Sequence, residues 1–316
     1  MPGVDRTLSP MHDIELPDGY TARPTTRDDL EATFRLVADC ELHDSGSVDV
    51  AMSDIAADWD RPDFDLSSMS ASVWQGDVLA ATADVFMGRA EVDVAPAHRG
   101  RGIGSAMLPW TWAVARADGR TRVGQTVSDR RTDAGELFRA NGYEVGHTAW
   151  ALRVDLGEQP PPSPALPEGL AFRDFRPVQD DRELFEVIDV AFAEWPDRES
   201  HGFENWAASS LWREEVVPEL VPLVVESDRI VGVALNYRYD GDEEGWTQHL
   251  AVDKRDRGRG LGRALLQESF RRFHTLGFRH CGLSTDSRTG ALGLYEHVGM
   301  YVRESFTRYT KRLDVT

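Results

Sequence analysis

Arginines and glycines alternate in residues 257–262 (RGRGLG), a composition that could bind a phosphate group. The segment follows an apolar run at residues 250–252 and precedes apolar residues at helical spacing. Glycine lets the backbone approach a ligand closely, and the first turn of a helix has N–H groups without an intrahelical partner. Those groups and the positive end of the helix dipole favour an anion, and the arginines add charge. The segment therefore predicts a phosphate-binding turn between a strand and a helix.

A second copy of this turn stands half a chain length earlier, at residues 99–104 (RGRGIG). It too follows an apolar strand-like run, at residues 92–94, and precedes an apolar helical run. One glycine-rich turn is weak evidence on its own. Two copies with the same flanks indicate an internal duplication.

The pattern Arg-x-x-Gly-x-Gly after a strand resembles the acetyl-CoA signature of the GNAT family of N-acetyltransferases, whose loop holds the CoA pyrophosphate. The resemblance covers both halves and nearly the whole chain, as in tandem-domain members of the mycothiol synthase-like type. The dinucleotide-binding turn of Rossmann proteins is the main competitor, but it lies near the first strand of its domain. Here the turn comes late in each half. The resemblance implies acetyl-CoA as the cosubstrate.

Cofactor contacts follow from the resemblance by position. In the second half they lie on the strand before the turn, on the turn itself, and just before the late helix. At this last place Ser287 stands where the family often has an asparagine. The predicted contacts are Leu250, Ala251, Val252, Arg257, Gly258, Arg259, Gly260, Leu261, Gly262 and Ser287. In the first half they are Val94, Arg99, Gly100, Arg101, Gly102 and Gly104.

Acetyl transfer to an alkylamine needs a proton acceptor, because the amine has a pKa of about 10.4, and a proton donor for the leaving thiolate. The resemblance assigns the donor to Tyr295, since the tyrosine of the family's late helix protonates the CoA sulfur. The alternative is a tyrosine packed as a core aromatic. In the first half, Phe138 aligns with Tyr295 and cannot donate a proton.

Two residues are candidates for the catalytic base. Glu244 precedes the central strand and could act through water, although it also suits a solvated hairpin turn. His249 has an ordinary pKa suited to this role, although a lone histidine in a strand is more often packed or hydrogen-bonded. The mycothiol synthase-like pattern has a glutamate where Trp246 stands here, so the family's base does not carry over directly.

Both halves predict the same order of elements: strand, helix, hairpin and strand before the glycine turn, then helix, strand, helix and strand. Proline-rich residues 159–167 predict a semi-rigid linker. We therefore expect an N-terminal GNAT-like domain at 1–157 that is degenerate, a linker at 158–168 and a catalytic C-terminal domain at 169–316. The expected class is α/β (α+β), each domain a twisted, mostly antiparallel mixed sheet flanked by helices. Residues 1–19 are expected to be a loose lead-in and 40–68 to be irregular.

The composition limits the partners. The net charge of −19 argues against nucleic acid. No apolar run has transmembrane length, the N-terminus lacks signal-peptide features, and the two cysteines have no partner spacing. These features predict a cytoplasmic protein without membrane contact and without a metal site. We also expect a monomer or homodimer.

The resulting expectation is an acetyl-CoA-dependent N-acetyltransferase that acts on a primary amine of a small molecule by direct attack, with Tyr295 as general acid. The alternative is a non-catalytic acyl-CoA-binding or interaction protein built on a tandem GNAT scaffold.

Overall fold

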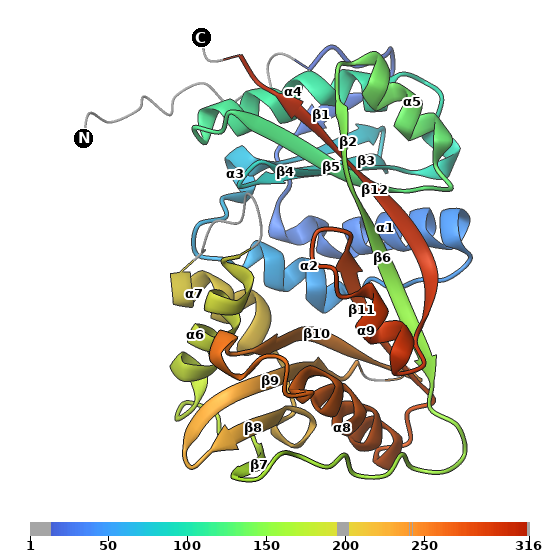
Figure 1. The fold of residues 1–316 in the computed structure, drawn as a ribbon. Coiled ribbons are helices and arrows are strands. Elements are labelled where there is room, and N and C mark those ends of the chain that lie inside the picture. Colours follow the sequence, from blue (N-terminus) through green and yellow to red (C-terminus); the bar gives the residue numbers. More distant parts are fainter. Residues whose placement is uncertain (1–13, 195–201, 240, 242, 315–316) are drawn as a thin grey trace, which may run out of the picture. The chain divides into compact units, whose positions relative to one another are not determined.

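The computed structural model describes residues 14–194, 202–239, 241 and 243–314 (Figure 1). The chain forms two compact units, one made of residues up to 148 together with those from 306 onward, the other of residues 149–305. Most of the expected lead-in, residues 1–13, lies outside the described residues. We describe each unit by itself.

The first unit is built on a sheet with strand order β1-β2-β3-β4-β5-β12. Neighbouring strands are antiparallel except β4 and β5, which are parallel. The strands are β1 (Thr21–Arg23), β2 (Ser70–Gln75), β3 (Val78–Phe86), β4 (Arg89–Val94), β5 (Arg122–Ser128) and the second half of β12 (Tyr301–Arg312).

Helices pack on this sheet, with α1 and α4 both against β3 and β4. They are α1 (Leu30–Ser45), α2 (Met52–Trp59), α3 (Leu66–Met69), α4 (Ile103–Ala117) and α5 (Thr132–Ala140). The expectation that residues 40–68 are irregular is wrong. They hold the end of α1 and the whole of α2, whose first turn is fixed by the Asp54 carboxylate, which accepts a hydrogen bond from the Ala51 N–H at 2.9 Å.

The second unit repeats this order, with strands β7-β8-β9-β10-β11-β6. Again one pair, β10 and β11, is parallel and the others are antiparallel. The strands are β7 (Leu170–Asp174), β8 (Pro222–Glu226), β9 (Arg229–Tyr237), β10 (Glu244–Val252), β11 (His280–Asp286) and the second half of β6 (Glu144–Asp155). The helices are α6 (Asp181–Phe192), α7 (Gly202–Trp206), η4 (Ala207–Leu211), η5 (Pro218–Leu220), η6 (Lys254–Asp256), α8 (Leu261–Thr275) and α9 (Leu292–His297). The expected fold class is confirmed.

The two units exchange their last strands. Residues 149–155 of β6 pair with β11 in the second unit, and residues 306–312 of β12 pair with β5 in the first. The compact units therefore divide within β6 and β12.

Alternation along β10 separates the two faces of the second sheet. Ala251 belongs to the core that contains α6 and α7, whereas Leu250 and Val252 pack against Leu261 and Leu265 of α8. Alternate side chains of the strand thus pack against the helices on opposite faces of the sheet.

A substitution at Gly245 tests the packing between β10 and α8. A methyl group added there would overlap the ring of Phe273, which is fully buried in α8. We expect Gly245→Ala to lower the free energy of unfolding by about 1–3 kcal/mol, as overpacking does. Urea unfolding of the full chain measures it. Gly293→Ala in α9 is the control, because nothing lies within 4 Å of its added methyl and helix propensity predicts a gain of about 0.5–1 kcal/mol. Equal midpoints for the two variants would contradict this packing.

Candidate active site

The second glycine turn joins β10 to α8. Gly258 and Gly260 have φ angles of +75° and +80°, in the left-handed region that favours glycine, and Gly260 is the N-cap of α8. Nothing lies within 4 Å of a Cβ built at either position. The start of α8 therefore faces open space with its unpartnered N–H groups, which is the geometry of an anion site.

Both arginines of this turn already have carboxylate partners. Arg257 donates from Nε to the Val252 carbonyl at 3.3 Å and from Nη1 to Glu194 at 2.5 Å. Arg259 donates to Asp256 at 2.6 Å. These contacts hold the turn against the end of β10. The backbone N–H groups at the start of α8 and the remaining guanidinium N–H groups are the donors available to a phosphate.

The parallel ladder between β10 and β11 is short. It pairs residues 244–247 with 280–283 and ends there, whereas β9 stays paired with β10 as far as Val252, across an irregularity between Thr247 and His249. The backbone of Leu250, Ala251 and Val252 therefore has no ladder on its β11 side among the described residues. This opened edge leads directly to the glycine turn and could hydrogen-bond a ligand as a strand would.

Tyr295 lies in α9, which follows β11. Its side chain is buried with Leu283 and Phe270. Burial raises the pKa of the Tyr295 phenol, and a hydrogen bond with Thr285 of β11 partly offsets this. The phenol is therefore protonated at neutral pH and available as a donor. Ser287 lies in the turn between β11 and α9.

Helix α5 of the first unit corresponds to helix α9 of the second, because each packs against the start of the helix that follows the glycine turn. A Cβ at Gly104 would lie 3.4 Å from Leu137, and one at Gly262 would lie 3.5 Å from Leu294. Phe138 therefore occupies the place of Tyr295. Its ring is buried between Tyr143 and Tyr309, with centroid distances of 5.1 and 5.2 Å.

The first glycine turn has the same backbone form as the second, with Gly100 at φ +72° and Gly102 at φ +89°. It is less open, because a Cβ at Gly102 would lie 3.5 Å from Pro17. Arg101 donates to the Tyr20 hydroxyl at 3.2 Å. Val94 ends β4 as Val252 ends β10.

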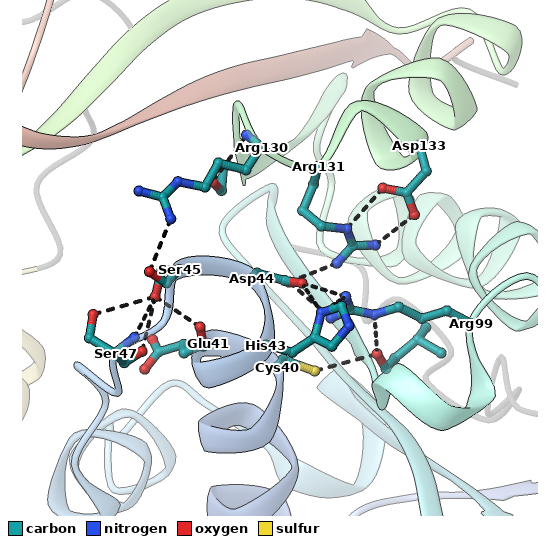
Figure 2. Close-up of polar contacts among 12 residues, drawn as sticks. Cys40, Glu41, His43, Asp44, Ser45, Ser47, Arg99, Arg130, Arg131 and Asp133 are labelled. Atoms are coloured by element: carbon teal, nitrogen blue, oxygen red, sulfur yellow. Dashed lines mark hydrogen bonds and ion pairs between the residues drawn. The ribbon is translucent and has the colours of Figure 1, made fainter.

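Arg99 anchors this turn through a network that Figure 2 shows. Its Nε donates to the Val94 carbonyl at 2.9 Å, and its two terminal nitrogens donate to Asp44 at 2.5 and 2.9 Å. Arg131 donates to the same carboxylate at 3.0 Å and also pairs with Asp133. Burial alone would raise the pKa of Asp44, but the hydrogen bonds from Arg99, His43 and Arg131 outweigh it and lower the pKa to about 2.

Glu244 is the first residue of β10 rather than part of a solvated turn. Its carboxylate accepts hydrogen bonds from Arg153 of β6 and lies 3.8 Å from Arg303 of β12. Only 19 % of its side chain is exposed. It stands at the end of β10 away from the glycine turn, with its charge balanced by arginine.

His249 lies on β10 where the ladder with β11 has ended. Its Nε2 accepts a hydrogen bond from the Trp206 indole at 3.4 Å, and its ring lies edge-on to Phe192 at 5.5 Å. An Nε2 that accepts belongs to a neutral imidazole. Neither aromatic neighbour was foreseen from the sequence, although both stand in segments with helical spacing.

No pattern in the sequence indicated the contacts of Thr285, Asp44 and Glu194. Thr285 and Glu194 carry no local signal, since each acts on a residue distant in the sequence. Within the described part of the chain, no three histidine, cysteine or carboxylate residues are grouped to hold a metal ion, and no helix is long and apolar enough to cross a bilayer.

Comparisons with known proteins agree with this geometry. The model of the Acetyltransferase (GNAT) family matches residues 182–300. A mycothiol acetyltransferase from Geodermatophilus obscurus is 30 % identical over 240 residues, covering 70 % of each chain. Another from Thermobispora bispora is 29 % identical over 230 residues, covering 70 % of this chain and 72 % of the relative.

Solved structures extend the similarity to nearly the whole chain. A GCN5-related N-acetyltransferase from Sphaerobacter thermophilus has a TM-score of 0.75 and 32 % identity, covering 95 % of this chain and 98 % of that one. A tandem GNAT protein from the clavulanic acid biosynthesis pathway has a TM-score of 0.69 at 15 % identity, covering 94 % and 99 %. At that identity the second similarity concerns the fold alone.

The Asp44 network gives a pH-dependent prediction. Because the folded-state pKa of Asp44 is lowered to about 2, its stabilisation is present above its ordinary pKa of 3.8 and is lost as the pH falls toward 2. We expect Asp44→Asn to lower the free energy of unfolding by about 1–2 kcal/mol at pH 7, allowing for solvent screening. Chemical denaturation between pH 7 and 2 should show the difference from wild type shrinking below pH 4.

Asp133→Asn is the matched control, because Asp133 shares the Arg131 partner but 65 % of its side chain is exposed, against 14 % for Asp44. We expect a change within about 0.5 kcal/mol. A deficit for Asp44→Asn that stays constant down to pH 2 would contradict the ion-pair explanation.

Proposed function

The chain belongs to the GNAT family of N-acetyltransferases, which use acetyl-CoA, and on this premise we propose that its second compact unit carries out the transfer. The acceptor is a primary amine of a small molecule, as the name mycothiol acetyltransferase suggests for the relatives. The observation that carries the proposal is the difference between the units: Tyr295 offers a buried hydroxyl where the first unit has Phe138.

Acetyl-CoA is held by backbone groups in this proposal. The N–H groups of residues 258–262 bind the pyrophosphate at the start of α8. The thioester arm lies along the opened edge of β10, where a backbone N–H of residues 250–252 stabilises the oxyanion. Among the described residues, β10 has no β11 partner beyond Thr247, and this supports the arrangement because the strand edge is available. Ser287, in the turn before α9, is the further contact proposed for the cofactor.

The reaction is a direct attack. The amine nitrogen forms a bond to the thioester carbonyl carbon and gives up a proton, and the C–S bond then breaks. The thiolate takes a proton from the Tyr295 hydroxyl. The phenolate that forms stays hydrogen-bonded to Thr285 and recovers its proton from solvent.

The base is proposed to be His249 or a water molecule that it orders, rather than Glu244. His249 lies beyond the end of the β10–β11 ladder, and the indole of Trp206 fixes its ring. The Glu244 carboxylate is balanced by Arg153 and Arg303 at the other end of the strand. We therefore expect a substitution that removes the Glu244 charge to change the stability of the fold more than the rate of proton transfer.

Tyr295→Phe tests the acid. It keeps the ring and removes the donor, so CoA affinity should be retained while turnover falls by roughly 10²–10⁴-fold. Thiol release from acetyl-CoA with a panel of amines measures turnover, and calorimetry measures affinity. Tyr143→Phe is the matched control, because its hydroxyl is also buried and accepts from Trp112 at 2.9 Å. Near-normal turnover of Tyr295→Phe in a chemistry-limited assay would remove Tyr295 from the mechanism.

Paired glycine variants test which unit works. Gly260→Asp places a strained residue and a negative charge at the start of α8, so amine-dependent turnover should be abolished. Gly102→Asp makes the same change at a φ of +89° in the first unit and should leave turnover largely intact. The first unit keeps an anion-binding turn, so it can still bind CoA without acetylating anything. The reverse outcome would locate the active site in the first unit.

A further inference from the structure

One carboxylate of the first unit, that of Asp44, binds two arginines that come from different turns (Figure 2). Arg99 belongs to the glycine turn after β4, and Arg131 is the N-cap of α5, in the turn after β5. Arg99 donates through both of its terminal nitrogens, and Arg131 donates through Nη1. Because Asp44 itself lies in α1, three elements of the first unit meet at this one group.

The position of Asp44 does not favour its own helix. It is the last residue but one of α1, where the helix dipole places partial negative charge. A carboxylate at that end of a helix is destabilising unless it has partners elsewhere. The stabilisation of the Asp44 charge therefore comes mainly from the arginines of the two turns.

A second contact fastens the turn after β5 to the same helix end. Arg130 donates from Nη1 to the carbonyl of Ser45 at 3.0 Å. Ser45 is the last residue of α1, and the last carbonyls of a helix have no intrahelical partner. Arg130 and Arg131 together hold the β5–α5 turn on the end of α1, and Arg99 holds the glycine turn there.

The two turns that Asp44 links stand on either side of the opening between β4 and β5. These strands form one described pair, Arg89 with Gly124, at the start of β4. Among the described residues, their ladder does not continue toward Val94 and Ser128, where the two turns begin. The proposed function places the thioester arm of the cofactor in the matching opening of the second unit. Asp44 thus connects the two sides of the first unit's opening.

The backbone beside this link keeps the form of an anion site. Gly100 and Gly102 have left-handed φ angles, and nothing lies within 4 Å of a Cβ built at Gly100. Gly102 is the N-cap of α4, whose first N–H groups have no intrahelical partner. Guanidinium groups bind carboxylates and phosphates with the same planar geometry. The carboxylate of Asp44 therefore stands where the two arginines could bind a phosphate.

The matching carboxylate of the second unit, Glu194, is held differently. It follows α6 by two residues, and its described partners, Arg257 and Lys254, both belong to the connection between β10 and α8. Its side chain is 39 % exposed, against 14 % for Asp44. Glu194 is thus open to exchange with an anion from solvent, whereas Asp44 joins two turns and is shielded.

We propose that Asp44 is a built-in anion that holds the first unit closed, so that CoA binds there only when this carboxylate leaves Arg99 and Arg131. While Asp44 is in place, a phosphate meets a negative charge and guanidinium groups that already bind a carboxylate. Once it leaves, both arginines can bind phosphate oxygens and the β5–α5 turn can move away from the glycine turn.

This inference goes beyond the proposed function, because it concerns the unit that does not carry out the transfer. The two share only the premise that a glycine turn of this form binds the CoA pyrophosphate. The second unit is tested by the turnover of Gly260→Asp. The closed state of the first unit is tested by CoA binding, so the failure of one can be told from the failure of the other.

Calorimetric titration of the full-length protein with CoA, at constant ionic strength, measures the effect of Asp44. Each protein is compared with its own Gly102→Asp derivative, and the binding that this substitution removes is assigned to the first unit. In Asp44→Ala, the first unit should bind CoA about tenfold more tightly than in wild type, or more, because charge-assisted donors are released. Asp44→Asn removes the charge and keeps the side-chain size, so it should also tighten binding.

Asp133→Ala is the matched control. It removes the same charge from the same unit and also takes a carboxylate from Arg131, but it leaves Asp44 bound to both arginines. The CoA affinity of the first unit should stay within about threefold of wild type, since Asp133 is an exposed ion-pair partner.

Folding is checked by urea unfolding of each variant before titration. If Asp44→Ala does not fold, Asp44→Asn decides the comparison, because its side chain fills the same space. First-unit CoA affinity that is unchanged in the Asp44 variant would overturn the proposal. Equal tightening by the Asp44 variant and Asp133→Ala would also overturn it, because the loss of any nearby negative charge would then explain the effect.

Discussion

The candidate active site depends on the early end of the parallel ladder between β10 and β11. Pairing between β10 and β11 stops at Thr247, while β9 continues alongside β10 to Val252. A strand with one free edge keeps its backbone donors available, and the same strand leads into the glycine turn at the start of α8. In the first unit the equivalent ladder is a single pair, Arg89 with Gly124. Both units thus open the sheet at the same strand, next to the same turn.

Much of this arrangement could be predicted from the sequence, because its signals are local. Alternating glycines before an apolar helical run predicted a turn between a strand and a helix, and Gly258 and Gly260 take left-handed φ angles in that turn. The hairpins and most helices were also predicted from periodicity. Helix α2 was missed because its eight residues are interspersed with acidic ones, although Ala51 followed by Asp54 is the spacing of a capping interaction.

What the sequence did not indicate depends on residues far apart in the chain. The exchange of β6 and β12 between units follows from pairing with β11 and β5, which no local pattern encodes. The setting of Glu244 was missed for the same reason, since its partner Arg153 lies on an exchanged strand. A residue in a short acidic segment resembles a solvated turn until its long-range partner is known. Such contacts are fixed by topology rather than by propensity.

The two units retain what the backbone makes and differ in what side chains make. Their glycine turns match in conformation, and in each an arginine ties the turn to the last strand residue and to a carboxylate, Asp44 or Glu194. A backbone cradle needs only glycines and a helix start, so it survives sequence divergence. A phenol or a carboxylate is lost or gained by one substitution, as Phe138 and Tyr295 illustrate. Because strand register is the same in both units, Asp84, Glu91 and Asp93 stand where the second unit has Leu235, His249 and Ala251, so the side chains of this face differ without any shift of a strand.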